Sequence, residues 1–216
     1  TGSPVRSEAP IPPGFVSDPG KYVMIPGNAR RRRVAVEERM NALTADAARH
    51  PANRIEWPEG LGDAKAEIGI ITSGIPYTYV KEVAPDAAVL KLGLVHPLSR
   101  EFVTAFADRV EKLYVVEELD AVLETQLKAW GIECIGKDAF PAIGEFTPAI
   151  VAAGLGRPSA QLRTAPEVDV AVRRPGLCPG CPHDHVFTEL RRKGMLVSGD
   201  IGCYSLGVLP PFEAMD

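Results

Sequence analysis

Between residues 66 and 151 the chain alternates short apolar runs with amphipathic segments, and this alternation limits the possible folds more than any other feature. The apolar runs are rich in β-branched residues, as buried strands are, whereas the segments between them carry apolar residues at helical spacing. This order is typical of strand–helix–strand units around a parallel sheet, with helices on the sheet faces. We therefore predict an α/β fold built as a three-layer, parallel-sheet domain.

The elements of this domain can be placed along the sequence. Strands are expected at residues 68–72, 89–92, 113–116 and 132–135, and helices are expected to begin near Pro76, after Ser99 and near Val122. Ser99 is suited to accept a hydrogen bond from a helix N-terminus. The first strand leaves through Thr72-Ser73-Gly74, which is similar to a phosphate-binding turn, but a single glycine favours a purely structural turn.

Few residues of this region are candidates for catalysis or ligand binding. Glu117 and Glu118 follow the third strand, at the carboxyl edge where ligand sites of open sheets gather. Because the sequence shows no acid–base partner for them, we expect solvated loop carboxylates. His96 precedes a proline and is expected to be structural, and Cys134 lies in an apolar run that predicts a buried structural thiol.

The segment before the domain is rich in proline. Residues 1–28 carry too many prolines for a regular helix or a central strand, so we predict an extended arm. Asn28 is expected to cap a helix that runs to His50 and packs one face on a neighbour. Its basic run, Arg30–Arg33, is expected to be a solvated or subunit-contacting face. The predicted layout is an arm with a helix at 1–60, an α/β domain at 61–156, a linker at 157–176 and a separate tail at 177–216.

Composition excludes several classes of protein. With 45% hydrophobic and 24% charged residues and a net charge of -4, the chain has the make-up of an ordinary globular protein. A sequence pI near 5.7 argues against a nucleic-acid-binding protein. The sequence has neither an apolar run of the roughly 20 residues that a membrane span needs nor an opening signal peptide, so we expect a cytoplasmic protein without membrane contact.

The tail holds three of the four cysteines. Cys178 and Cys181 flank a Pro-Gly turn that points both thiols the same way, and Cys203 lies in a second glycine-rich turn after a predicted helix at about 183–190 and a predicted strand at 195–198. In a reducing compartment such spacing indicates metal or redox use rather than a disulfide framework. A zinc site with His183 or His185 as the fourth ligand, an iron–sulfur cluster, a dithiol redox pair and glycine turns around an organic cofactor remain open.

The tail motifs resemble those of a known family. The stretches 177–183, 199–207 and 209–216 are similar to the start of the thiamine-diphosphate-binding domain in the large (alpha) subunit of indolepyruvate:ferredoxin oxidoreductases. Upstream, Lys21-Tyr22-Val23, the arginine-rich helix and the stretch 140–148 are similar to the segment that precedes this domain. The α/β region between them resembles the transketolase C-terminal-like domain of the same subunit.

The resemblance implies oxidative decarboxylation of aryl pyruvates such as indolepyruvate to aryl-acetyl-coenzyme A. Thiamine diphosphate with Mg²⁺ would carry the reaction, and a 4Fe-4S cluster would pass electrons to ferredoxin. Implied partners are a smaller beta subunit, ferredoxin, coenzyme A and the aryl pyruvate. By resemblance, Cys178, Cys181 and Cys203 match cluster ligands, and the turn formed by Asp200, Ile201, Gly202, Cys203 and Tyr204 matches the turn against thiamine diphosphate.

The chain departs from the family pattern in ways that bear on activity. A fourth cluster cysteine after Cys203, the magnesium and diphosphate motif, and the amino-terminal pyrimidine-binding domain are all missing from these 216 residues. We therefore expect a piece of a larger subunit that acts as a scaffold, is inactive alone and retains no cofactor. The alternative is a stand-alone Cys/His metal-binding module.

Overall fold

The computed structural model describes residues 14–158, 171 and 175–215. The chain forms two compact units, Thr1–Leu162 and Arg163–Asp216, which are described separately below. The division lies inside the predicted linker at 157–176, most of which is outside the described residues. The predicted extended arm is likewise described only from residue 14.

The first unit is built on a four-stranded sheet in the order β1-β3-β2-β4. Strands β2 (Ala66–Ser73), β3 (Ala88–Leu92) and β4 (Val110–Val116) are parallel, and they confirm the first three predicted strands. A short strand that the sequence pattern did not reveal, β1 (Arg54–Glu56), pairs antiparallel with β3 at the edge. It lies before the expected domain start at residue 61.

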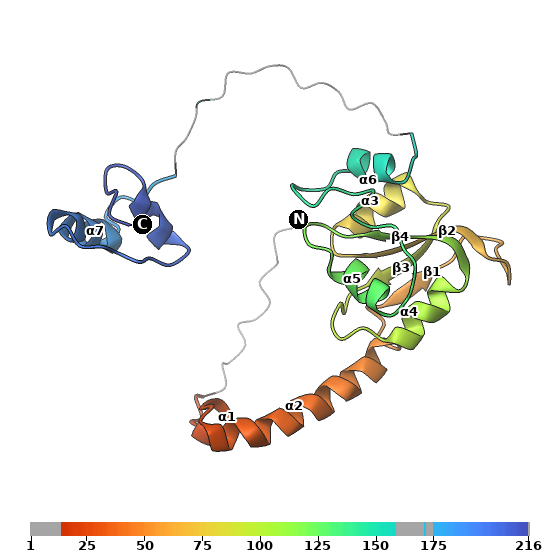
Figure 1. Cartoon of the computed structure of the whole chain (residues 1–216), viewed down its shortest axis with the longest axis horizontal. Coiled ribbons are helices and arrows are strands. Elements are labelled where there is room, and N and C mark those ends of the chain that lie inside the picture. The colour runs from red at the N-terminus through yellow and green to blue at the C-terminus, as the bar shows by residue number, and fades with distance from the viewer. Residues whose placement is uncertain (1–13, 159–170, 172–174, 216) are drawn as a thin grey trace. The chain divides into compact units, whose positions relative to one another are not determined.

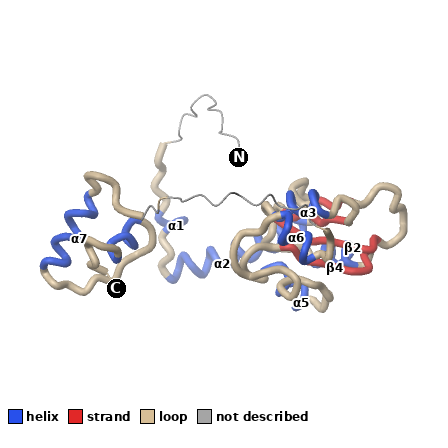
Figure 2. The backbone as a smooth tube through the Cα atoms, turned by 90° about the horizontal axis from the view of Figure 1, so that it is seen from above, coloured by secondary structure: helices blue, strands red, loops and turns tan. Residues whose placement is uncertain are grey.

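Helices cover both faces of the sheet, as Figures 1 and 2 show. On one face α3 (Pro76–Val83) and α6 (Pro148–Gly154) pack against Ile70, Val89 and Val116. On the other face α4 (Arg100–Ala107) and α5 (Val122–Ala129) pack against Ile71, Leu90 and Val115. Neighbouring residues of one strand thus pack into two different hydrophobic cores, because successive side chains of a strand point to opposite faces of the sheet. The predicted three-layer α/β architecture is confirmed, with one antiparallel edge strand added.

The prediction of a fourth strand at 132–135 is wrong. Of this segment only Ile135 bridges to the sheet, where Val115 N donates to Ile135 O at 2.8 Å and Ile135 N donates to Leu113 O at 2.9 Å. The chain then turns away because Lys137 N donates to a carboxylate oxygen of Glu124 at 2.8 Å. Gly136 is required at this turn, since an added Cβ would lie 2.2 Å from that carboxylate.

Before the sheet lie a one-turn helix, α1 (Pro19–Tyr22), and a long helix, α2 (Pro26–Ala47). The predicted extended arm is therefore partly helical, because Asp18 accepts a hydrogen bond from Lys21 N and Pro19 occupies the first helical position. Asn28 does not cap α2. Its amide instead donates to Val23 O at 2.9 Å from within the helix.

The far end of α2 is fixed to the sheet unit by one asparagine. Asn53 donates to Ala47 O at 2.9 Å, and its carbonyl oxygen accepts from Gly93 N and Leu94 N at 2.7 and 2.8 Å. The helix therefore ends at Ala47 rather than at the predicted His50. Ala47 is its only buried residue, so the expected packing face is absent from the described part of the chain.

The second unit contains α7 (Pro182–Arg192) and a 3₁₀-helix, η1 (Cys203–Val208). The predicted helix is confirmed, although it begins slightly earlier, at Pro182. The predicted strand at 195–198 does not form, and among the described residues this unit has no strand at all. A single extended segment without a paired neighbour cannot satisfy its backbone as a sheet does. Cys203 therefore does not lie at a sheet edge.

Candidate functional site

A hollow of the sheet unit lies at the carboxyl edge, where β2 and β4 end side by side. Its volume is about 410 Å³, and its lining consists of Ser73, Gly74, Ile75, Pro76, Val95, Glu117, Glu118, Leu119, Asp120, Val122 and Leu123. The helix after β2 covers one sheet face and a helix after β4 covers the other. Such a switch point is where open α/β sheets bind ligands. We call this hollow the carboxyl-edge crevice.

Glu117 is not the solvated carboxylate that the sequence suggested. It is 7% exposed, and its two carboxylate oxygens accept hydrogen bonds from Leu123 N at 2.8 Å and Glu124 N at 3.0 Å. These amides belong to the first turn of α5, so Glu117 supplies the acceptors and the negative charge that a helix N-terminus favours. Glu117 is therefore a positioning residue of the fold.

Glu118 also binds backbone. Its Oε1 accepts from Phe146 N at 2.7 Å, which ties the long loop before α6 to the end of β4. Lys137, which the sequence did not single out, donates from Nζ to the carbonyl of Glu117. Both carboxylates are therefore engaged with backbone amides, and they do not form an acid–base pair. This arrangement gives the crevice an acidic wall without an evident catalytic group.

The Thr72-Ser73-Gly74 turn is structural, as the single glycine suggested. Thr72 is buried and donates from Oγ1 to Val116 O at 2.8 Å, which joins the ends of β2 and β4. Gly74 has a φ of 61°, a left-handed conformation that favours glycine. Ser73 lies half-buried in the crevice wall.

In the second unit, the Cys178–Cys181 stretch forms the tight turn that its sequence predicts. Cys181 N donates to Cys178 O at 3.0 Å, and Gly180 has a φ of 76°. Cys178 is exposed and Cys181 is half-buried immediately before α7. The turn therefore presents at least one thiol to solvent.

The second predicted turn precedes η1. Gly202 adopts a φ of 107°, and Asp200 Oδ1 accepts from Ile201 N at 2.7 Å. The Ile201 side chain is 92% exposed, an unusual position for a large apolar group, and Cys203 is exposed. The five predicted cofactor-contact residues thus form a surface turn that ends in the first turn of η1.

Aromatic side chains hold the two turns in one unit. The rings of His183 and Tyr204 have centroids 4.5 Å apart, and Phe187 lies 5.8 Å from Tyr204 and 6.0 Å from Phe212. Cys181 precedes His183 by two residues and Cys203 directly precedes Tyr204, so these two cysteines flank the same stack. His183 packs as an aromatic residue here rather than as a metal ligand.

The three tail cysteines do not form a ready ligand group. Within the described residues, no set of three or more His, Cys, Asp or Glu side chains is placed to hold a metal ion. A 4Fe-4S cluster takes four ligands, and the tail contributes three cysteines. In this structure the donor set therefore does not yet fit a cluster or a tetrahedral zinc ion.

The fourth cysteine lies in the sheet unit. Cys134 is half-buried against the core that contains Leu123 and Leu127. Burial, together with the nearby Glu124 carboxylate, raises the pKa of its thiol. A raised pKa leaves little thiolate, so Cys134 is poorly suited to bind a metal or react.

Leu119 is the crevice residue that sequence reasoning missed. It lies directly after Glu118. Ligand sites of open sheets gather at the carboxyl ends of strands, and this expectation, which pointed to the two glutamates, applies to Leu119 as well. What the sequence could not show is its backbone, which has a φ of 56°, with the side chain 58% exposed. No pattern marks a leucine for that conformation.

Nearly all of the chain aligns with one kind of curated protein. Indolepyruvate oxidoreductase subunit IorA of Thermococcus kodakarensis is 34% identical over 94% of this chain and 34% of its own length, and that of Pyrococcus abyssi is 35% identical over the same shares. The subunit from Methanothermobacter thermautotrophicus is 30% identical over 98% of this chain and 37% of its own length. The chain thus spans about a third of the relatives it matches.

The chain is also similar in part to a solved structure. A solved structure of 2-oxoglutarate:ferredoxin oxidoreductase from Magnetococcus marinus, with 2-oxoglutarate, coenzyme A and succinyl-CoA bound, matches 62% of this chain and 23% of that chain. Its TM-score is 0.47 and its sequence identity is 20%, too low to place any residue. No family model matches the chain. The resemblance predicted from the tail motifs is confirmed by the curated relatives: the chain is related over most of its length to a segment of indolepyruvate oxidoreductase subunit IorA.

Proposed function

We propose that the chain is a segment of the large subunit of a ferredoxin-dependent oxidoreductase that converts aryl pyruvates, such as indolepyruvate, to aryl-acetyl-coenzyme A. The observation that carries this proposal is the alignment of 94% of the chain with subunit IorA at 34% identity. Since the chain spans only 34% of that relative, the other parts of such a subunit complete the active site. The 216 residues alone are then inactive.

The sheet unit acts as a transketolase C-terminal-like scaffold in this proposal. The carboxylates of its crevice, Glu117 and Glu118, accept hydrogen bonds from backbone amides. General acid–base catalysis needs a titratable group free to exchange a proton with the substrate. A positioning and subunit-contact role therefore suits this unit better than catalysis.

The tail supplies the start of a thiamine-diphosphate-binding domain. In this role Asp200, Ile201, Gly202, Cys203 and Tyr204 would hold thiamine diphosphate, and the Mg²⁺ that accompanies this cofactor would be bound elsewhere in the subunit. When bound, thiamine diphosphate would supply the chemistry of the decarboxylation. Support comes from the exposed apolar side chain of Ile201 beside the positive φ of Gly202, which lets a flat ligand approach the backbone closely.

Cys178, Cys181 and Cys203 are three ligands of a 4Fe-4S cluster in the same proposal, and its fourth ligand comes from another part of the enzyme. Such a cluster would supply electron transfer to ferredoxin in the complete enzyme, which would also contain the smaller beta subunit. A reducing cytoplasmic location suits the free thiols.

The proposal is tested on the complete large subunit purified with its partner subunit. Iron, sulfide and thiamine diphosphate are measured per subunit in Cys178→Ser, Cys181→Ser and Cys203→Ser, and Cys134→Ser is the matched control. We expect each tail variant to lose cluster iron and the control to retain it. Equal iron in all four variants would show that the tail cysteines bind no cluster.

The alternative is a stand-alone Cys/His metal-binding module, which the compact packing of the tail around Phe187 favours. Such a module would retain about one zinc ion in the isolated 216-residue chain and lose tail structure with a chelator. Under the leading proposal the isolated chain contains no stoichiometric metal, and a chelator changes nothing.

A further inference from the structure

Two thiols lie three residues apart at the start of the tail. Cys178 and Cys181 are free cysteines, the first exposed and the second half-buried. Within the described residues, neither belongs to a group of three or more His, Cys, Asp or Glu side chains that could hold a metal ion. In this structure the two cysteines are therefore best considered as a dithiol pair.

The backbone between the two cysteines already holds them together. Cys181 N donates to Cys178 O at 3.0 Å, which closes a β-turn, and Gly180 has the positive φ, 76°, that the third position of a type II turn needs. The Cα atoms at the two ends of a β-turn lie less than about 7 Å apart, and those of a disulfide lie about 4.4 to 6.8 Å apart. The turn therefore brings Cys178 and Cys181 within reach of a disulfide with little movement of the backbone.

A disulfide between these two cysteines costs less chain entropy than one to Cys203. Pro179 and Gly180 separate the pair, and the proline ring fixes φ at the second position of the turn. A disulfide from Cys203 to either cysteine would close a much longer loop, and the entropy cost of closure grows with loop length. The preformed turn therefore favours the pairing of Cys178 with Cys181.

The exposed position of Cys178 allows it to react with a small disulfide in solution. Its thiolate attacks one sulfur of a low-molecular-weight disulfide, which forms a mixed disulfide and releases one small thiol. The Cys181 thiolate then attacks the Cys178 sulfur, which releases the second small thiol and leaves a Cys178–Cys181 disulfide. The pair loses two electrons and two protons, and the small disulfide gains both, so the exchange needs no further reactant.

We propose that Cys178 and Cys181 form a reversible intramolecular disulfide by exchange with low-molecular-weight disulfides, and that the pair is a redox switch at the start of the tail. A sulfur bound in a disulfide has no thiolate to give to a metal ion. Oxidation of the pair and metal binding at these two positions therefore exclude each other. The proposal concerns the thiols alone and does not depend on the proposed enzymatic function.

Equilibration of the full 216-residue chain in glutathione buffers tests the switch. The reduced chain is incubated without oxygen at increasing ratios of glutathione disulfide to glutathione, the remaining thiols are alkylated, and tryptic peptides are analysed by mass spectrometry. Cys178 and Cys181 lie in one tryptic peptide, whereas Cys134 and Cys203 lie in two others. We expect the shared peptide to lose two hydrogens and both alkylation sites together, and to regain them on reduction.

Cysteine substitutions distinguish a pair from single reactive thiols. In Cys178→Ser and in Cys181→Ser the remaining cysteine should carry a glutathione adduct, because the second exchange step is then impossible. Cys203→Ser and Cys134→Ser are the matched controls, and both should oxidise at the same buffer ratio as the wild type. Glutathione adducts alone on the wild-type chain, or a disulfide that joins Cys203, would overturn the proposal.

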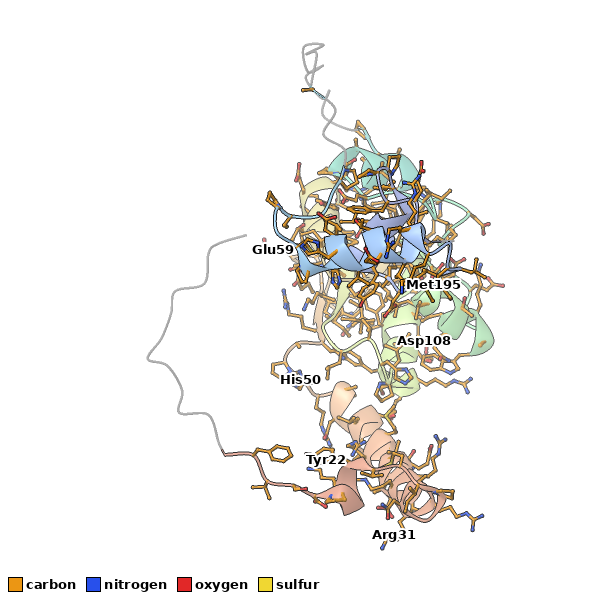
Figure 3. The ribbon with its side chains drawn as sticks, turned by 90° about the vertical axis from the view of Figure 1, so that its left-hand side faces the viewer. Tyr22, Arg31, His50, Glu59, Asp108 and Met195 are labelled. Atoms are coloured by element: carbon orange, nitrogen blue, oxygen red, sulfur yellow. The ribbon has the colours of Figure 1, made fainter. Side chains whose placement is uncertain are left out.

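A glycine substitution tests the contribution of the preformed turn. Gly180→Ala places a Cβ at a φ of 76°, which opposes the turn and should lower the equilibrium constant for disulfide formation about tenfold. Gly194→Ala is the matched control and should leave that constant unchanged. Gly194 has a φ of 60° and directly precedes Met195, which Figure 3 shows at the end of α7, whereas Cys181 lies at the start of this helix. Equal constants in the two variants, or a wild-type pair that stays reduced in glutathione disulfide without glutathione, would also overturn the proposal.

Discussion

The sheet unit and the tail bury their apolar residues in different ways. In the sheet unit, Ile70, Ile71, Val89 and Leu90 are fully buried between helices that cover both faces. In the tail, one ring, Phe187, is the largest buried group, and its neighbours are partly exposed aromatic residues. In the sheet unit, strands and helices from distant parts of the sequence share two cores, whereas in the tail a few aromatic residues pack around one ring.

This contrast bears on how each unit holds its candidate site. The sheet unit fixes Glu117 and Glu118 through backbone hydrogen bonds from other elements. The tail holds its two turns through a stack of His183 and Tyr204 and an exposed ion pair between Arg191 and Glu213. A unit of this size without a larger core needs a ligand or further chain to become rigid. We therefore expect the tail to be much the less stable of the two.

The largest expected effect is on the sheet core. Phe106→Ala removes a fully buried ring that packs on Trp57 with centroids 5.4 Å apart. The substitution should lower the free energy of unfolding by about 3–5 kcal/mol. Urea unfolding followed by the fluorescence of Trp57 and Trp130, which both pack against this core, measures it. Phe15→Ala, at a side chain 94% exposed, is the control and should change nothing.

The corresponding substitution in the tail tests whether the two units unfold independently. Phe187→Ala removes the ring that contacts Gly207, where an added Cβ would lie 2.7 Å from Phe187. A loss of about 3 kcal/mol should exceed the stability of this small unit and unfold it alone. Hydrogen exchange should show lost protection in α7 with β2–β4 unchanged. Val186→Ala, at an exposed side chain, should preserve the protection, and joint loss in both units would refute their independence.

A smaller effect is expected where a carboxylate caps a helix. Glu117→Gln keeps the size of the side chain but removes its charge, and it replaces one of the two oxygens that accept from Leu123 N and Glu124 N with an amide NH₂ group that cannot accept. We expect a loss of about 1–2 kcal/mol, since a charged acceptor becomes neutral at a helix N-terminus. Thermal unfolding of Glu117→Gln against the exposed control Glu133→Gln measures it. Equal midpoints would show that the charge and the second acceptor oxygen of Glu117 contribute no stability.

The smallest expected effect depends on pH. Burial alone would raise the pKa of Glu56, but hydrogen bonds from Lys81, Tyr77 and Arg54 outweigh it and lower the pKa to about 2. Because the folded-state pKa is depressed, the stabilisation is complete above the unfolded value of 4.5 and is lost as pH falls towards 2. Partial exposure reduces it to about 1 kcal/mol.

This pH dependence is measured by urea unfolding between neutral and acidic pH. Glu56→Gln should flatten part of the decline below pH 4.5, whereas the exposed control Glu59→Gln should not. The effect should be confined to the sheet unit, because Glu56 joins β1 to α3. A wild-type slope in Glu56→Gln would contradict the assigned ion pair.

The sequence predicted the parts of the fold that depend on local pattern. The apolar runs of β2, β3 and β4, and the Ser99 cap, which accepts from Phe102 N, follow from residue types and their spacing. Strand β1 was missed because three residues give no pattern, and it forms through pairing with the distant β3. The strand predicted at 132–135 failed for the opposite reason: the apolar pattern is present, but Glu124 turns the chain away.

The sequence predicted where the candidate site lies in the fold, but it did not predict the hydrogen bonds and contacts of the site residues. Chain order and the carboxyl-edge rule located Glu117 and Glu118, yet their hydrogen bonds to α5 and to Phe146 depend on tertiary structure. In the tail, the cysteine spacing predicted the turn, whereas the His183–Tyr204 stack joins residues with no shared pattern. The expected strand before Cys203 did not form because the tail provides it with no partner strand among the described residues.

We propose that this chain is a segment of an aryl-pyruvate oxidoreductase, and that proposal can be tested on the complete enzyme. The most direct measurement is ferredoxin reduction by the complete large subunit with its partner subunit, thiamine diphosphate, coenzyme A and indolepyruvate. We expect reduction of ferredoxin that requires both indolepyruvate and coenzyme A and that yields the aryl-acetyl-coenzyme A product. Ferredoxin that stays oxidised with indolepyruvate and other aryl pyruvates, while the cofactors are bound, would contradict it.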